Sequence, residues 1–251
     1  MSDKNNTGNP WSKINAVQYY TKNRHSVNEI YASEKFFLTK AIQMNDSILD
    51  VGCAAGGFYE VFKSIQPTIT YIGVDFSSKM ILKAQKLFPQ ASFVISDGGL
   101  LPFRKESIDI VYCSGAIHLA LNWREIIREC WRVAKRNFIF DVRLVENSAS
   151  IENIKKSYEK IAFYDKWDGK AVVPYIILNV RDFLSEISYL KPKPVVQQYY
   201  GYYSQVSSMA VSPFKEVCMT MCCLGKEINA DNPNCWNLPL KKPNLSDNGR
   251  H

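Results

Sequence analysis

The sequence lacks any long apolar run. No window of its 251 residues approaches the roughly 18 consecutive apolar residues that a membrane-spanning helix needs. The first residues, MSDKNNTGNPW, are polar and contain no apolar segment of the kind found in secretory signal peptides. We therefore expect a cytoplasmic protein without a membrane span. The 46% hydrophobic content is enough to build a full core, and we expect one large domain with an added lid.

Patterns for metal binding and disulfide bonding are also missing. The seven cysteines are odd in number and lie mostly in apolar stretches, which favours reduced thiols over a disulfide framework. Three of them lie in KEVCMTMCCLGK (215–226), which alternates like a strand. No histidine lies nearby, and no second cysteine pair has the spacing of a zinc site. We therefore expect no metal.

The sequence has no internal repeat and no long basic run. Its net charge of +7 comes from scattered lysines and arginines with only short groups, such as Lys155-Lys156. This charge could attract an anionic substrate or a nucleic acid, but a solvated surface is the better explanation. We treat nucleic acid as an unlikely partner, and the oligomeric state is not legible from the sequence.

What the sequence does contain is an alternation of short β-branched runs and helical patterns. The expected strands are 47–51, 68–75, 91–97, 107–114 and 137–144. Between them, residues 58–65 place apolar side chains at helical spacing, Ser77 or Ser78 can cap a second helix, and Asn122 can cap a third. Such an alternation predicts an α/β fold with a parallel sheet covered by helices on both faces.

The regular alternation of strand and helix patterns ends at about Glu146. We expect an amphipathic helix over 151–162, an irregular aromatic stretch after it, and a helix capped by Asn179. Two further strand patterns, 194–203 and 216–223, could pair antiparallel at the sheet edge. The expected units are an N-terminal helical cap (1–45), a core (46–145), a lid insertion and helix (146–193), C-terminal sheet strands (194–226) and a polar tail (227–251).

The stretch DVGCAAGG (50–57) follows the first expected strand, where doubly wound sheets bind their ligands. Gly52 and Gly56 remove the Cβ atom where a ligand or a positive φ requires it, and Ala54 keeps the turn thin. A nicotinamide dinucleotide site would have glycine where Ala54 stands. The Asp50 carboxylate would also repel a pyrophosphate, whereas it would attract a cationic amino-acid group.

In this segment the sequence resembles the class I S-adenosylmethionine-dependent methyltransferases, and in particular the group that modifies small molecules. The resemblance covers residues 46–145 and includes YIGVDFSSKMILKAQ and the run from SDGGLLPF to CSGAIH. It implies a Rossmann-like, seven-stranded, mostly parallel sheet with an antiparallel C-terminal edge strand and a helical, aromatic lid. Family members usually have a glycine where this chain has Lys135-Arg136-Asn137, a change that we expect to alter only a turn.

The resemblance also implies a set of residues that bind S-adenosyl-L-methionine. Asp75 would accept both ribose hydroxyls, and two oxygens on one carboxylate suit that role. Asp97 would face the adenine amino group, and Ser114 would close the methionine end. The full implied set is Tyr20, Asp50, Gly52, Cys53, Ala54, Gly56, Asp75, Phe76, Met80, Asp97, Gly98 and Ser114.

The expected reaction is methyl transfer to an oxygen, nitrogen or carbon atom of a small-molecule acceptor. An in-line displacement depends most on the orientation of the two reactants, and a base is needed only if the acceptor must lose a proton. His118 is the candidate base because it follows the fourth expected strand, although an isolated histidine in an apolar loop is more often a hydrogen-bonded packing residue. An RNA-modifying methyltransferase, a noncatalytic binding protein and, more remotely, a nicotinamide dehydrogenase remain as alternatives.

Overall fold

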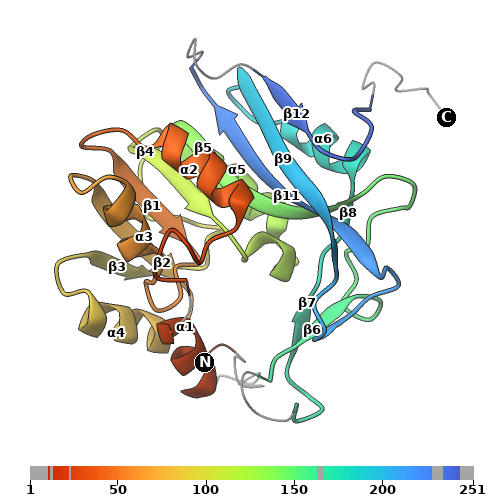
Figure 1. The fold of residues 1–251 in the computed structure, drawn as a ribbon, viewed down its shortest axis with the longest axis horizontal. Helices are drawn as coiled ribbons and strands as arrows, with labels where there is room; N and C mark the ends of the chain where they lie inside the picture. The colour runs from red at the N-terminus through yellow and green to blue at the C-terminus, as the bar shows by residue number, and fades with distance from the viewer. Residues whose placement is uncertain (1–10, 12–13, 23, 163–166, 228–233, 244–251) are drawn as a thin grey trace, which may run out of the picture.

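The structure is a computed structural model that describes residues 11, 14–22, 24–162, 167–227 and 234–243. These residues form a central sheet of nine strands, helices on both of its faces, and a second sheet of three strands (Figure 1). From edge to edge the central sheet runs β12 (Cys235–Asn237), β9 (Val196–Gln205), β11 (Glu216–Gly225), β5 (Ala134–Val145), β4 (Ile108–Cys113), β1 (Ser47–Val51), β2 (Thr70–Asp75) and β3 (Ser92–Ile95), and β8 (Leu178–Asn179) pairs with β5.

The strands β3, β2, β1, β4 and β5 are mutually parallel, whereas β11 is antiparallel to both β5 and β9. This arrangement confirms the Rossmann-like fold and the antiparallel pairing of 194–203 with 216–223. The sheet has nine strands rather than seven, because the short strands β8 and β12 are added. The outermost strand is therefore β12, which is parallel to β9.

The described residues form six α-helices (Figure 1). They are α1 (Ile14–Lys22), α2 (Ala32–Ala41), α3 (Phe58–Ile65), α4 (Ser78–Leu87), α5 (Trp123–Val133) and α6 (Val180–Ser188). Apolar side chains of α2, α3 and α4 pack on one face of the sheet, and those of α5 and α6 pack on the other. The two faces are separate cores, as expected for a sheet that is apolar on both sides.

The predicted helix caps are confirmed in two of three places. The side chains of Ser77 and Asn179 accept hydrogen bonds from backbone N–H groups of the helices that follow. Asn122 precedes α5 but makes no such bond. Residues 135–137, expected to form a turn, lie inside β5, which continues straight from the end of α5.

The prediction of a helix over 151–162 is wrong. Ile151 forms a bridge with Ile177, and Tyr158–Lys160 is strand β6. This strand is the middle of the small sheet, between β7 (Val172–Pro174) and β10 (Ala210–Val211). Apolar residues three or four apart also arise when a strand follows a turn, so their spacing alone does not identify a helix.

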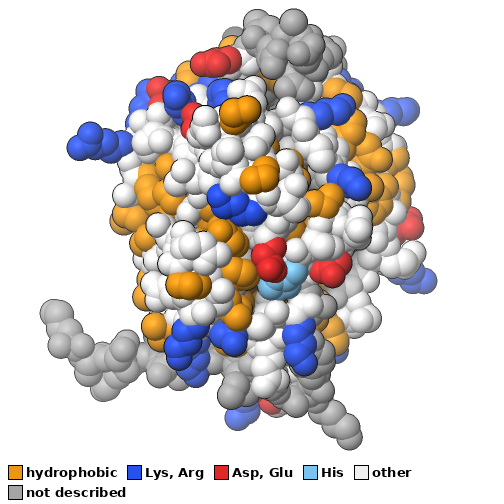
Figure 2. Space-filling view, turned by 60° about the vertical axis from the view of Figure 1, so that its left-hand side comes forward, with side chains coloured by type: hydrophobic (Ala, Val, Ile, Leu, Met, Phe, Trp, Pro, Cys, Tyr) orange, Lys and Arg blue, Asp and Glu red, His pale blue; other side chains and the backbone are white. Residues whose placement is uncertain are grey.

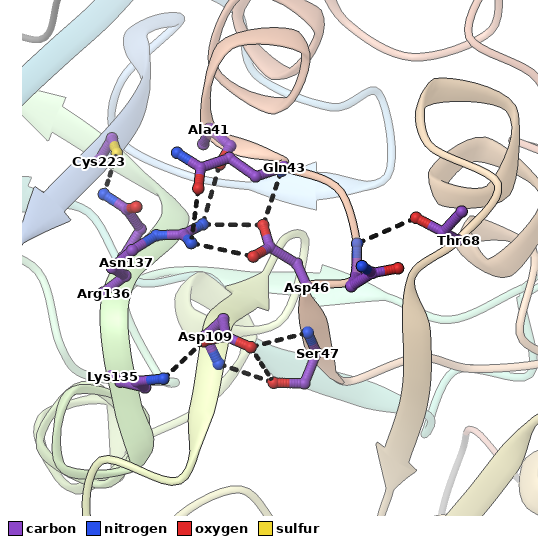
Figure 3. A network of polar contacts seen from close by, with 11 residues as sticks. Ala41, Gln43, Asp46, Ser47, Thr68, Asp109, Lys135, Arg136, Asn137 and Cys223 are labelled. Atoms are coloured by element: carbon purple, nitrogen blue, oxygen red, sulfur yellow. Dashed lines mark hydrogen bonds and ion pairs between the residues drawn. The ribbon is translucent and has the colours of Figure 1, made fainter.

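The end of the sheet where β1, β4 and β5 begin is closed by polar contacts (Figure 3). The guanidinium of Arg136 donates to both carboxylate oxygens of Asp46, at 2.9 and 2.8 Å. Asp109 accepts from the backbone and the hydroxyl of Ser47 and pairs with Lys135. Each carboxylate here has its partner within the protein.

Among the described helices, none is long and apolar enough to cross a membrane.

Candidate active site at the carboxyl ends of the strands

A cavity of about 390 Å³ opens where β1, β2 and β4 end. It is lined by Trp11, Tyr20, Arg24, Asp50, Val51, Gly52, Cys53, Ala54, Gly57, Phe58, Asp75, Phe76, Met80, Ser96, Asp97, Gly98, Tyr112, Cys113, Ser114, Gly115, Ala116, Leu119, Ala120, Asn122 and Ile126. Of the twelve residues implied for cofactor binding, eleven line this cavity. The exception is Gly56.

The loop after β1 is thin because its backbone lies in the left-handed region. Gly52 has φ +80°, and a Cβ atom there would lie 2.9 Å from the Cβ of Ala116. Ala54 has φ +47°, and its N–H donates to Asp75. Gly56 also has a positive φ, but a Cβ there would meet the rings of Phe93 and Phe88. Gly56 therefore serves the packing of the loop on the sheet, not the cavity.

Asp50 is buried at the end of β1. Its Oδ2 accepts a hydrogen bond of 2.7 Å from the Tyr71 hydroxyl, while Oδ1 has no partner among the described residues. Burial raises the pKa of Asp50 to about 7, against the opposing effects of the Tyr71 hydrogen bond and the charge of Arg24. Such a carboxylate gains most from a cationic ligand, which would replace the missing partner.

Asp75 lies at the end of β2. Its two oxygens accept from the N–H groups of Ala54, at 3.0 Å, and Ser77, at 2.8 Å. Burial raises its pKa, partly offset by these two bonds. Each oxygen retains a lone pair for a further donor. Beside it, Met80 is buried, whereas Phe76 is 48% exposed at the cavity mouth.

Asp97 follows β3 and is exposed. Its Oδ1 accepts from the N–H groups of Gly99 and Leu100, which fixes the loop in a tight turn. Gly98 has φ +74°, and a Cβ there would lie 3.1 Å from Val51. The carboxylates that follow β1, β2 and β3 thus border one cavity, as the order of the motifs predicted.

A buried ion pair, which the sequence analysis missed, closes the other side of the cavity. Glu34 of α2 is fully buried and pairs with Arg24. Its Oε1 also accepts from Tyr112 at 2.8 Å and from Ser114 at 2.7 Å. Arg24 lines the cavity, and its Nε is buried with no hydrogen-bond partner among the described residues. No motif marks Arg24, since its partners lie on distant segments.

Tyr20 of α1 covers the cavity from the side of the N-terminal segment. Its ring lies edge-on to Tyr19 at 5.1 Å between centroids and 6.1 Å from Trp11. Helix α1 packs on α4, where Ala16 meets Ala55 and Met80. These contacts place Tyr20 against Ala54 and Ala55 of the loop after β1, and its contact with a cofactor stays a prediction.

His118 lies apart from the cavity lining. It is buried in a short 3-10 helix (Ile117–Leu119), with its ring edge-on to Tyr175 at 5.6 Å. Its Nε2 lies 3.3 Å from Nη2 of Arg143, and a guanidinium can only donate, so Nε2 accepts and the ring proton is on Nδ1. Nδ1 lies 3.9 Å from Asp141, beyond hydrogen-bond distance.

The surroundings of His118 do not suit a base. Burial, together with the charge of Arg143, lowers its pKa to about 3, although Asp141 opposes this effect. The Nε2 lone pair is already used, and protonation would place a second positive charge beside Arg143. Asp141 instead holds the loop, because its Oδ1 accepts from the Gly115 N–H at 2.6 Å. Among the described residues, no group of His, Cys, Asp or Glu side chains could hold a metal.

Comparison with known proteins agrees with this geometry. Residues 49–140 match the methyltransferase domain family. Over this region the chain is therefore similar to a methyltransferase domain. Demethylmenaquinone methyltransferase of Thermotoga maritima is 31% identical over 91 residues, which are 36% of this chain and 40% of that protein. The chain thus matches about 40% of the length of this curated relative.

Solved methyltransferase structures share the fold over a larger part of the chain. An S-adenosylmethionine-dependent methyltransferase of Methanosarcina mazei has a TM-score of 0.54 at 14% identity, covering 80% of this chain and 99% of its own. Geranyl diphosphate C-methyltransferase of Streptomyces coelicolor has a TM-score of 0.51 at 12% identity, covering 78% of this chain and 76% of its own. At these identities the likeness shows the fold and not the substrate.

Proposed function

We propose that the protein transfers a methyl group from S-adenosyl-L-methionine to an oxygen, nitrogen or carbon atom of a small-molecule acceptor. The observation that carries this proposal is the cavity bordered by Asp50, Asp75 and Asp97, in which Asp50 and Asp75 keep oxygen lone pairs free of protein donors. Carboxylates held this way are complementary to a ligand that carries several donors and a positive charge.

The residues fit the chemistry of the cofactor. Asp75 would accept the two ribose hydroxyls, and Asp50 would accept the ammonium of the amino-acid portion. Arg24, ionised and held by Glu34, would donate through its unpartnered Nε to the carboxylate of the same portion. Phe76 and Met80 would border the adenine, and Asp97 would face its amino group. Gly98 would contribute its backbone.

When bound, S-adenosyl-L-methionine supplies a methyl group on a cationic sulfur, which makes that carbon reactive toward a nucleophile. The chain then has to orient the acceptor and exclude water. The loop 114–120 lines the cavity beyond Ser114, and Asp141 fixes it through Gly115. We infer that His118 supports this loop and does not remove a proton, because its lone pair is occupied by Arg143.

A small molecule is the acceptor class that we favour over RNA. Similar proteins include a demethylmenaquinone methyltransferase, a trans-aconitate 2-methyltransferase and a geranyl diphosphate C-methyltransferase, and each of these names gives a small-molecule acceptor. On the face drawn in Figure 2, basic side chains are interspersed with acidic and uncharged ones. A basic stripe, which is the usual electrostatic footprint of a nucleic-acid site, would support the alternative.

Binding of S-adenosylhomocysteine, measured by calorimetry, tests the proposal. The wild-type chain should bind it, and Asp75→Asn should weaken binding about thirtyfold, since one acceptor of the hydroxyls becomes a donor. Glu216→Gln is the matched control, because Glu216 is exposed on β11 away from the cavity. Failure of the wild-type chain to bind, or equal affinities of the two variants, would contradict the proposal.

The thiols support a reducing compartment, and we propose the cytoplasm. All seven cysteines are free, and six of them are buried. Burial raises the pKa of Cys223 to about 12, so its thiol stays protonated and unreactive at neutral pH. These are the properties of core side chains.

A further inference from the structure

The small sheet carries one carboxylate among its described strand residues, that of Glu159. Glu159 lies in β6, the middle strand, directly opposite Val173 of β7 and Ala210 of β10. Residues opposite one another in antiparallel strands project from the same face of a sheet. The Glu159 side chain therefore shares a face with Val173, which is buried, and with Ala210.

This face points toward the main domain. Ala210 packs in an apolar cluster with Tyr175, Val145 at the end of β5, and Leu119, which lines the cavity. The opposite face of β6 carries Lys160, whose ammonium lies 5.0 Å from the centre of the Trp167 ring. Figure 1 shows the small sheet beyond the carboxyl end of β5. Glu159 thus projects from the same face as this cluster, and Lys160 projects from the opposite face.

The Glu159 carboxylate has no hydrogen bond or ion pair with any of the described residues, and it is half-buried. Burial raises its pKa, against the opposing charge of Arg143. The pKa of the Tyr20 hydroxyl is raised by burial and by the charges of Tyr19 and Glu159. The charge of Glu159 therefore acts on Tyr20 of α1 and on Tyr175, which follows β7, and the charge of Arg143 of β5 acts on Glu159.

An unpaired acid in such a place needs a reason, because a half-buried carboxylate without a partner is costly. We propose that Glu159 faces the methyl acceptor and takes up the proton that the acceptor loses. The inference rests on the proposed methyl transfer. It assigns the base to the small sheet, on the face that carries Glu159, instead of to His118.

The step balances without a further reactant. A lone pair of the acceptor atom forms the new bond to the methyl carbon, and the carbon–sulfur bond breaks with its electron pair going to sulfur. The proton of the acceptor O–H or N–H group passes to the Glu159 carboxylate and from there to water. The preferred acceptor is therefore a hydroxyl or an amine, whose proton must leave during or after the transfer.

The test uses sinefungin, an analogue of S-adenosylmethionine in which a carbon bearing a primary amine replaces the sulfonium and its methyl group. Its ammonium stands toward the acceptor position, whereas S-adenosylhomocysteine has no group there. In the variant Glu159→Gln, which keeps the shape of the side chain, sinefungin should bind about tenfold more weakly because a charge-assisted contact is lost. Affinity for S-adenosylhomocysteine should stay within about twofold.

Lys160→Gln is the matched control, since it neutralises the next residue on the opposite face of the same strand. It should leave both affinities unchanged. The proposal is overturned if Glu159→Gln leaves the ratio of the two affinities unchanged, whether it affects neither ligand or weakens the binding of both equally. Binding of S-adenosylhomocysteine by the same variant shows that it is folded. If the wild-type chain binds neither ligand, the proposed function fails, and this inference fails with it.

Discussion

At the end of the sheet where β1, β4 and β5 begin, Asp46 receives Arg136 on both carboxylate oxygens. At the end where these strands stop, Asp50 is equally buried but has one oxygen without a protein partner. The first arrangement stabilises the fold, because the charges compensate each other. The second costs stability that a bound ligand would return, as is common at functional sites.

Removing the ion pair between Arg136 and Asp46 should have the largest effect on stability. In Arg136→Met, the buried Asp46 carboxylate keeps only the backbone N–H of Gln43, so we expect a loss of about 3 kcal/mol in the free energy of unfolding. Urea denaturation measures it. Lys135→Met is the control, because Lys135 is exposed and should contribute less than about 1 kcal/mol. Equal losses in the two variants would remove the contrast between the two ends.

At the other end of the strands, the ionised Asp50 carboxylate should lower the stability of the fold instead of raising it. Burial raises the pKa of Asp50 to about 7 from an ordinary 3.8, so the folded chain binds more protons than the unfolded chain between these values. Stability from this group is thus present at low pH and lost as pH rises through about 7. In the wild-type chain, this group should lower the free energy of unfolding by on the order of 2 kcal/mol between about pH 5 and pH 8, and Asp50→Asn should remove that decrease.

Asp50→Asn should also bind S-adenosylhomocysteine more weakly, whereas the loss of the Arg136–Asp46 pair should affect only stability. Urea denaturation at the two pH values and calorimetry with S-adenosylhomocysteine are the measurements. Affinity of the wild-type chain should rise with pH as Asp50 ionises, and that of Asp50→Asn should be low and nearly flat. An unchanged pH dependence of stability in Asp50→Asn would mean that Asp50 is ionised in the free protein.

Replacing Arg24, which lines the cavity, should have a smaller effect, and only on ligand affinity. If its guanidinium binds the carboxylate of the amino-acid portion, Arg24→Met should weaken S-adenosylhomocysteine about tenfold. Methylthioadenosine, which lacks that portion, should bind the variant as well as the wild-type chain. Lys22→Met, at the exposed end of α1, is the control. Equal weakening of both ligands would indicate that Arg24 only supports the cavity wall.

The smallest expected change concerns His118. Because burial and Arg143 hold its pKa at about 3, its imidazole should remain neutral with the proton on Nδ1 between pH 8 and pH 5. Nitrogen-15 chemical shifts of the ring, assigned with His118→Gln, measure this state. A titration with a midpoint near 6.5 would restore His118 as a possible base.

The sequence was sufficient for the parts of the fold that depend on local pattern. The five strands from 47 to 144 were predicted because β-branched runs and turn residues mark each of them. Most of the eleven implied residues that line the cavity lie at or just after the carboxyl end of a parallel strand, and these ends share one edge of the sheet. Tyr20 and Met80 reach the cavity from helices α1 and α4 instead. Their contacts with a cofactor stay predictions.

What could not be predicted depends on pairing across long separations. Strand β6 exists because 158–160 meets 172–174 and 210–211, and no local signal names those partners. Glu34 and Ser114 are 80 residues apart in the chain. The character of His118 is set by Arg143 and Asp141, so its position after a strand could not separate a base from a packing residue.

Strand β12 has a consequence for the behaviour of the whole molecule in concentrated solution. By pairing Cys235–Asn237 with β9, the segment occupies backbone groups that would otherwise offer a template to another chain. The Trp236 indole fixes the segment through a hydrogen bond to the carbonyl of Leu240. A chain shortened before Asn234 would present the full length of β9 to its neighbours, and self-association through strand addition would follow.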